Sequence, residues 1–147
     1  MKDIEMITEY LNAVYQNTRT AIQSIEDIIT KVKDDKFKAE LSSQEDKYLV
    51  LEKECELLAK SEGIKGIKDN NWMEKIKLWG SINMSTMTNK TNRHIAELML
   101  MGTFMGYLTC EKDLADHKDV SPEIDEILRK LKELEKENLE ALMPYLI

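Results

Sequence analysis

The side chains best suited to chemistry in this sequence are a few imidazoles, carboxylates and amides that lie in segments with a helical pattern. His94 precedes Glu97 by three residues, so the two would share one face of a helix and could bind a metal ion weakly. Gln44 and Glu52 are the further candidates, and together the four could form an irregular iron or manganese site. We favour the simpler interpretation of His94 and Glu97 as a hydrogen-bonded or exposed pair near a helix start.

Patterns typical of catalysis are missing from the sequence, and we predict no catalytic residue. A histidine phosphotransfer domain would have Lys and Gly after its histidine, whereas Glu97 follows His94 here and would repel a phosphoryl group. No Gly-rich phosphate loop is present, and no Cys or Ser stands near a His in a recognisable arrangement. Cys55 and Cys110 lack metal or redox spacing, so we expect two buried free thiols, with a disulfide as the alternative.

Composition predicts a single all-α domain over residues 1–147. The chain is 42% hydrophobic and 33% charged, which suits a packed core, and it has few turn formers, with 5 Gly and 2 Pro. Its net charge of −7 disfavours binding to nucleic acid. The uncharged run from Leu98 to Cys110 has 13 residues, short of the ~20 that span a bilayer. With no secretory leader visible, we expect a cytoplasmic protein without a membrane partner.

Apolar residues at alternating steps of three and four predict five helices. Asp34 and Asp35 suit the start of the second helix, and Gly63 suits its end. Ser121 and Pro122 open the last helix, because Ser caps a helix and Pro fits its first position. The predicted helices cover residues 3–33, 35–61, 71–88, 92–118 and 122–143. Their predicted inward faces are Ile4, Ile7, Leu11, Val14, Ala21, Ile25, Ile28 and Val32 in the first helix, Phe37, Leu41, Gln44, Tyr48, Leu51, Cys55 and Leu58 in the second, and Ile124, Ile127, Leu131, Leu134, Asn138, Ala141 and Tyr145 in the last.

The helix over 92–118 is unusual because the stretch from Leu98 to Leu108 is apolar on every side. Such a helix is buried on most sides or faces a second chain. Gly102 and Gly106 allow another helix to approach closely, and Met105 lies between them as an adaptable packing residue. We expect these three positions to pack within the core, with a homodimer interface as the alternative.

One apolar residue from each long helix is predicted to be almost completely buried: Ile25, Leu51, Leu98 and Leu131. The inward face of the first helix, over 4–32, carries no carboxylate, and we expect the core as a whole to be free of carboxylates. The short helix over 71–88 lies in a long connection, where Trp72 and Trp79 are expected to hold it against the bundle.

The predicted order is a helix pair, a long connection and a second helix pair, which is one way to close a four-helix bundle. Several local features accompany this order of helices: Leu11-Asn12 early in the first helix, Gly63 at the end of the second, the Trp72–Trp79 stretch in the connection, and Gly102 followed by Glu111 in the third long helix. With these features the chain resembles the small ferritin-like bundles of bacteria, in particular a group of about this length without an assigned function. The resemblance implies a ferritin-like four-helix bundle with a long crossover that contains an extra short helix.

Ferritin-like proteins often bind two iron or manganese ions, held in part by Glu-x-x-His pairs. This sequence has no such pair. Thr91 stands where a Glu would precede His94, and Leu114 stands where a Glu would precede His117. The resemblance in fold therefore does not bring the metal site with it, and we expect no cofactor.

Two functions follow as hypotheses. The first is a non-enzymatic structural or interaction protein, with an unknown protein partner, on a ferritin-like scaffold that lacks the usual di-metal ligands. The second is a ferritin-like metalloprotein with redox or iron-handling activity, in which His94, Glu97, Gln44 and Glu52 form an irregular site.

Overall fold

The computed structural model describes residues 4–64, 88–116 and 121–147, and all regular structure within them is helical. This confirms the all-α prediction for the described residues. The predicted helix 71–88, with Trp72 and Trp79, lies outside them. The elements are α1 (Ile4–Ile29), α2 (Asp35–Ser61), α4 (Asn92–Asp116), α5 (Pro122–Leu142) and the short 3-10 helix η1 (Met143–Leu146).

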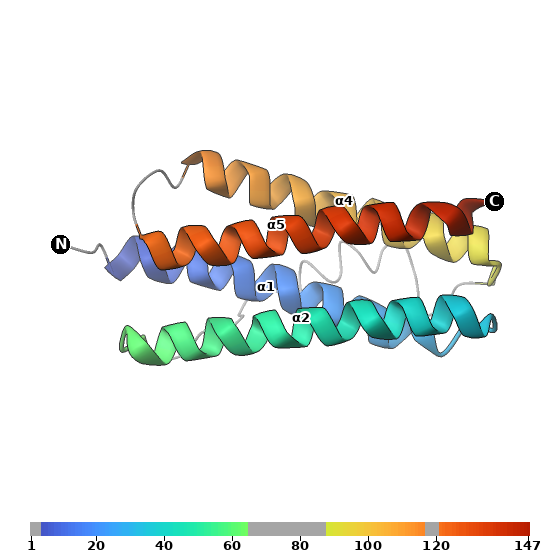
Figure 1. The fold of residues 1–147 in the computed structure, drawn as a ribbon, viewed down its shortest axis with the longest axis horizontal. Helices are drawn as coiled ribbons and strands as arrows, with labels where there is room; N and C mark the ends of the chain where they lie inside the picture. Colours follow the sequence, from blue (N-terminus) through green and yellow to red (C-terminus); the bar gives the residue numbers. More distant parts are fainter. Residues whose placement is uncertain (1–3, 65–87, 117–120) are drawn as a thin grey trace.

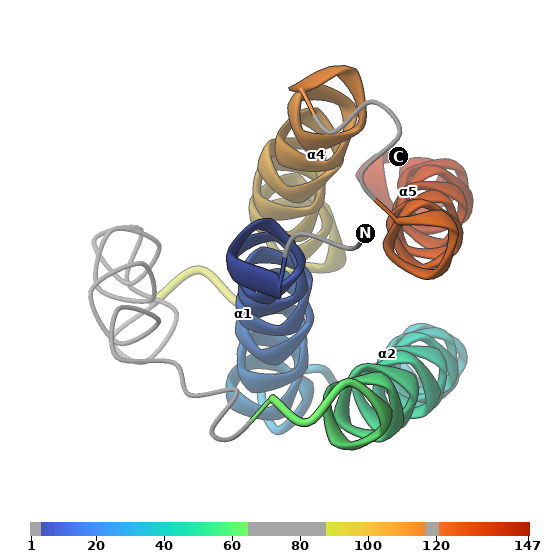
Figure 2. The same cartoon turned by 90° about the vertical axis from the view of Figure 1, so that its left-hand side faces the viewer.

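The four long helices lie side by side as two antiparallel pairs. Figure 1 shows α1 and α2 running in opposite directions, and likewise α4 and α5, while α2 and α4 run the same way. Viewed along the bundle, α1 stands between α2 and α4 (Figure 2). It packs against α2, α4 and α5, so a wide arc of its surface is buried.

Local capping sets the helix boundaries that the sequence predicted best. Asp34 Oδ1 accepts a hydrogen bond from the Phe37 amide at 3.0 Å, so α2 begins at Asp35 as predicted. Ser121 caps α5 in the same way, and Pro122 is its first residue. Gly63 follows the end of α2 with a φ of +68°, a conformation that side chains disfavour.

The first helix is shorter than predicted, because it ends at Ile29 rather than near residue 33. The amides of Lys31 and Val32 bond to carbonyls three residues back, which tightens the last turn before the cap at Asp34. The last predicted helix changes after Leu142 into the 3-10 helix that contains Pro144. Helix α4 is described as far as Asp116, two residues short of its predicted end.

The four core residues predicted from the sequence are all buried. Ile25 and Leu131 are 0% exposed, Leu51 is 4% exposed and Leu98 is 5% exposed.

The predicted face of α1 is wrong at its first member, Ile4, which is 47% exposed. Ile22 lies outside the predicted face of α1 but is buried, because α1 packs against three other helices and so buries a wider arc of its surface.

The expectation of a core without carboxylates is wrong. Glu135 of α5 is 1% exposed, although it lies in a segment rich in Lys and Glu. Like α1, helix α5 packs against three other long helices, so positions beside the predicted stripe also turn inward. Leu128 and Glu135 are buried for this reason.

Four large apolar side chains of α4 are about half exposed, between 45% and 54%: Met101, Phe104, Met105 and Leu108. The described part of the chain therefore leaves one side of this helix exposed, and the predicted helix 71–88, which was expected to help cover it, lies outside the described residues. That it faces a second chain stays a prediction. Among the described residues, no helix is both long enough and apolar enough to cross a membrane.

Candidate functional site

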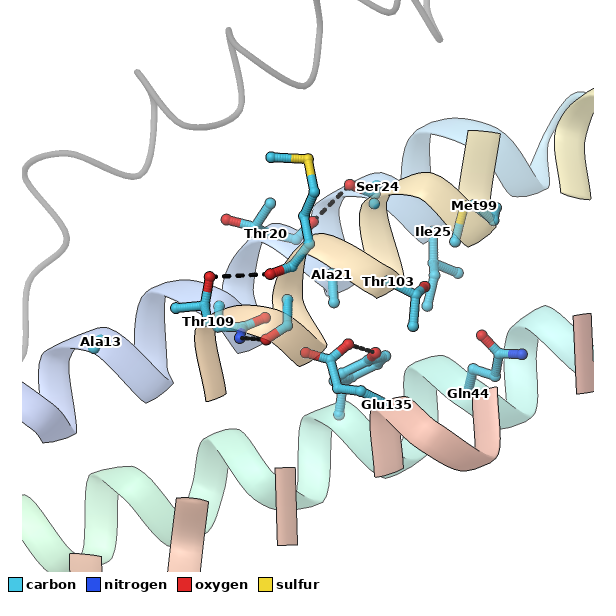
Figure 3. Close-up of a pocket in the computed structure, with 15 residues that line it drawn as sticks. Ala13, Thr20, Ala21, Ser24, Ile25, Gln44, Met99, Thr103, Thr109 and Glu135 are labelled. Atoms are coloured by element: carbon cyan, nitrogen blue, oxygen red, sulfur yellow. Dashed lines mark hydrogen bonds between the residues drawn. The ribbon is translucent and has the colours of Figure 1, made fainter. Parts of the chain in front are cut away.

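A cavity of about 280 Å³ lies within the bundle between α1 and α4, with α5 and α2 beneath it (Figure 3). Small residues leave this space, because Ala13 and Ala21 of α1 face Gly102 and Gly106 of α4 across it. Ile25 and two methionines add apolar surface to the wall. The cavity is thus mainly apolar, and its size suits a small molecule.

Glu135 provides the single acidic group among the described residues that line the cavity. Figure 3 shows its carboxyl group rising from α5 toward the space between α1 and α4. The Tyr48 hydroxyl, from α2, donates a hydrogen bond of 2.7 Å to Oε2. Oε1 accepts no hydrogen bond from the described residues although it is fully buried. A buried polar atom without a partner is rare and calls for an explanation.

Burial raises the pKa of Glu135 from 4.5 to about 8. Tyr48 and Asn17 lie close enough to favour the ionised form, but they offset only part of that effect. No Lys, Arg or His is found among the described lining residues, so the carboxylate has no opposite charge beside it. At neutral pH the group therefore carries a proton for most of the time.

Asn17 and Gly106 join α1 to α4 next to this carboxyl group. The Asn17 amide Nδ2 donates to the Gly106 carbonyl at 3.1 Å and more weakly to Cys110 Sγ at 3.6 Å. A Cβ atom on Gly106 would collide with Glu135 Oε1 and would stand 2.8 Å from Asn17 Oδ1. The absence of a side chain at Gly106 is what leaves room for the carboxyl group.

Gly106→Ala is expected to lower the free energy of unfolding by roughly 1–3 kcal/mol, because Glu135 and Asn17 are held by other bonds and cannot move aside freely. Urea unfolding measures the change. The matched control places the same substitution on a Glu135→Ala background, where the larger of the two collisions is gone and most of the loss should disappear. An equal loss on both backgrounds would show that Glu135 does not cause it.

Three of the four Ser and Thr hydroxyls that line the cavity have their protons engaged, and Thr103 is the fourth. The hydroxyls of Ser24, Thr20 and Thr109 each donate to a backbone carbonyl four residues back, at 2.7 to 3.0 Å. The Gln44 amide Nε2 donates to Glu40 at 3.3 Å. The three engaged hydroxyls have only oxygen lone pairs left, whereas the Gln44 amide keeps a second N–H.

The structure distributes the predicted metal candidates among different surroundings. Gln44 is buried and lines the cavity, whereas the Glu52 carboxylate accepts a 2.8 Å hydrogen bond from Arg19. His94 is half-buried near the start of α4, and Glu97 is exposed. Within the described ranges, no three His, Cys, Asp or Glu side chains are grouped so as to hold a metal ion.

The predicted packing residues of α4 also take part in the cavity. Gly102 and Gly106 line it, and Met105 stands at its wall with 54% of its surface exposed. Cys55 and Cys110 are buried and free, as predicted, and the disulfide alternative is wrong. Burial raises the pKa of the Cys55 thiol to about 12 and that of Cys110 further, so neither is a reactive thiolate at neutral pH.

Sequence reasoning missed Glu135, the residue that gives the cavity its chemistry. A signal was present, because Glu135 lies four residues after Leu131 and three before Asn138, both on the predicted inward face. Tyr48 and Gln44 were on the predicted inward face of α2, and both are buried.

Comparison with protein families, curated proteins and solved structures finds no match to this chain. The cavity and the groups that line it are therefore the features that indicate a function. Three properties matter for what it could bind: its volume, its apolar wall and the buried carboxyl group of Glu135.

Proposed function

We propose that this protein is a non-catalytic binding protein that holds a small, mainly apolar molecule in the cavity above Glu135. The proposal rests on a cavity of about 280 Å³ lined by Glu135, whose carboxyl oxygen Oε1 is buried and has no hydrogen-bond partner among the described residues. An engineered cavity of ~150 Å³ is enough for benzene, so this one has room for a larger molecule. Ligand sites typically combine an apolar wall with a few polar groups that fix orientation, and this site has that composition.

A ferritin-like scaffold is part of the same proposal. Two antiparallel pairs, with α2 and α4 running in the same direction, fit a bundle in which a long crossover joins the pairs (Figure 1). On this scaffold the centre of the bundle, where ferritin-like proteins often hold metal ions, would instead hold the ligand. The role is interaction rather than turnover, since no activated nucleophile lines the described cavity wall.

The alternative function, a metalloprotein with an iron or manganese site, requires several anionic or imidazole ligands around one ion. Glu135 alone supplies a carboxylate from the described lining, and Gln44 could add an amide oxygen. Elemental analysis of protein purified without chelators separates the two functions. Stoichiometric iron or manganese would favour the metalloprotein and would count against an apolar ligand in the cavity.

Filling the cavity tests the proposed function. Ala21→Leu places a large side chain at the wall between α1 and α4, and it is expected to weaken the binding of phenethyl alcohol about ten-fold or more. NMR shifts of the Ile25 methyl groups follow the titration. Ala39→Leu is the matched control, because Ala39 is an exposed residue of α2 and the same change there should leave binding unaltered.

The proposal fails if phenethyl alcohol does not shift the Ile25 signals in a saturable way. It also fails if Ala21→Leu and Ala39→Leu bind the probe equally well, since the binding site would then lie outside the cavity.

A further inference from the structure

The groups around the cavity select a particular kind of ligand, and this inference rests on the proposed function. We propose that the ligand is a small amine, whose ammonium group bonds to the Glu135 carboxylate while its apolar body lies between α1 and α4. The juxtaposition that supports it is a cavity without a cation, lined by Glu135, whose buried Oε1 has no hydrogen-bond partner among the described residues, and by three hydroxyls that can only accept further bonds.

Three hydroxyl groups of the cavity wall can only accept further hydrogen bonds. Ser24, Thr20 and Thr109 each use their proton in a bond to the backbone of their own helix. A hydroxyl has one proton and two lone pairs, so each of these oxygens can accept a further bond but has no proton left to give. Ser24 and Thr20 stand together at the α1 side of the cavity, with Thr109 on the α4 side (Figure 3).

The amide and phenol groups near Glu135 also form hydrogen bonds within the protein. Asn17 donates to the Gly106 carbonyl, Gln44 donates to Glu40, and the Tyr48 hydroxyl donates to Glu135 Oε2. The Tyr48 proton and the Asn17 amide are therefore engaged, the Gln44 amide keeps one N–H, and Asn17 Oδ1 remains as an acceptor beside Gly106. An ammonium group is complementary to this set of acceptors, because it has three N–H donors and no acceptor.

The Glu135 carboxylate lacks a balancing positive charge among the described lining residues. A buried carboxylate is costly unless a cation compensates it, and none of the described lining residues is Lys, Arg or His. A ligand cation would supply the missing charge at Oε1, the oxygen that Tyr48 leaves unpaired. The net charge of −7 also favours the approach of cations over anions.

Three probes of the same size and different head groups test the inference by calorimetric titration: phenethylamine, phenethyl alcohol and phenylacetate. Wild-type protein at pH 8 is expected to bind the amine at least about ten-fold more tightly than the alcohol, and phenylacetate most weakly. Glu135→Gln keeps the size of the side chain and removes its charge, so the preference for the amine should disappear while the alcohol still binds.

The dependence of amine binding on pH provides a second measurement that does not rely on the variant. Binding requires the Glu135 carboxylate, so affinity should rise about nine-fold from pH 6 to pH 7 and about five-fold from pH 7 to pH 8, while alcohol binding should stay flat or weaken. The groups that face Glu135 are Asn17 from α1, Tyr48 from α2 and Cys110 from α4, and the last two are uncharged in this range because their pKa values are raised.

The outcomes separate this inference from the proposed function. Equal binding of the amine and the alcohol, with both sensitive to Ala21→Leu, would overturn the amine and leave the binding cavity in place. Tightest binding of phenylacetate would likewise overturn it. If none of the three probes binds, the proposed function fails together with the inference.

Discussion

Between pH 5 and pH 8, the Glu135→Gln variant is expected to gain roughly 3–4 kcal/mol in free energy of unfolding relative to wild type. The reason is the raised pKa of Glu135, which is about 8 in the folded protein and 4.5 without burial. Between these values the folded state holds a proton that the unfolded state has released. The wild-type free energy of unfolding therefore falls as pH rises, by up to about 1.4 kcal/mol per pH unit.

The substitution removes this titration and preserves the bond to Tyr48, because the amide oxygen of Gln can accept the same hydrogen bond. Urea unfolding at intervals from pH 5 to pH 8 measures the difference between the two proteins. Glu97→Gln is the matched control, since Glu97 is exposed and its loss should leave the pH dependence of wild type intact. Parallel curves for wild type and Glu135→Gln would contradict the account of a carboxyl group that is protonated in the folded state.

The second large effect is expected in the core, where Leu131→Ala should lower the free energy of unfolding by roughly 2–5 kcal/mol. Leu131 is 0% exposed on α5, so the substitution loses buried apolar surface and leaves a void that close-packed neighbours fill only in part. Thermal or urea unfolding at a fixed pH gives the value.

Leu57→Ala provides the comparison for the same chemical change, because Leu57 of α2 is 58% exposed. Its effect should stay within ~0.5 kcal/mol, as is usual for surface positions. A loss under ~1 kcal/mol at Leu131 would mean that the inward face of α5 is assigned wrongly.

Helix starts were predictable from the sequence because they depend on neighbouring residues. Asp34 and Ser121 cap the amides three residues on, and such bonds are local in sequence. The end of α1 was less predictable, since its apolar pattern continues to Val32 and that residue is in fact buried, although the helix ends at Ile29. Burial and helix length are separate properties, and the apolar pattern reports the first.

The site was harder to predict than the fold, because it depends on how many neighbours each helix has. Glu135 turns inward only because α5 packs against three other long helices, which periodicity along one segment does not reveal. The cavity arises from small residues on two helices, such as Ala21 and Gly102, and their register across the bundle is a property of the tertiary structure. Gly106 could be predicted as a packing position, but not as the neighbour of a carboxyl group.

A carbon NMR titration of the Glu135 side-chain carboxyl, with and without phenethylamine, tests most directly whether this group is protonated in the folded protein and binds an ammonium group. We expect a midpoint near pH 8 in the free protein, and a lower midpoint when the ammonium group occupies the cavity and favours the carboxylate. Glu135→Gln identifies the signal by its disappearance. A midpoint near the ordinary value of 4.5 in the free protein, unchanged by saturating phenethylamine, would contradict the account.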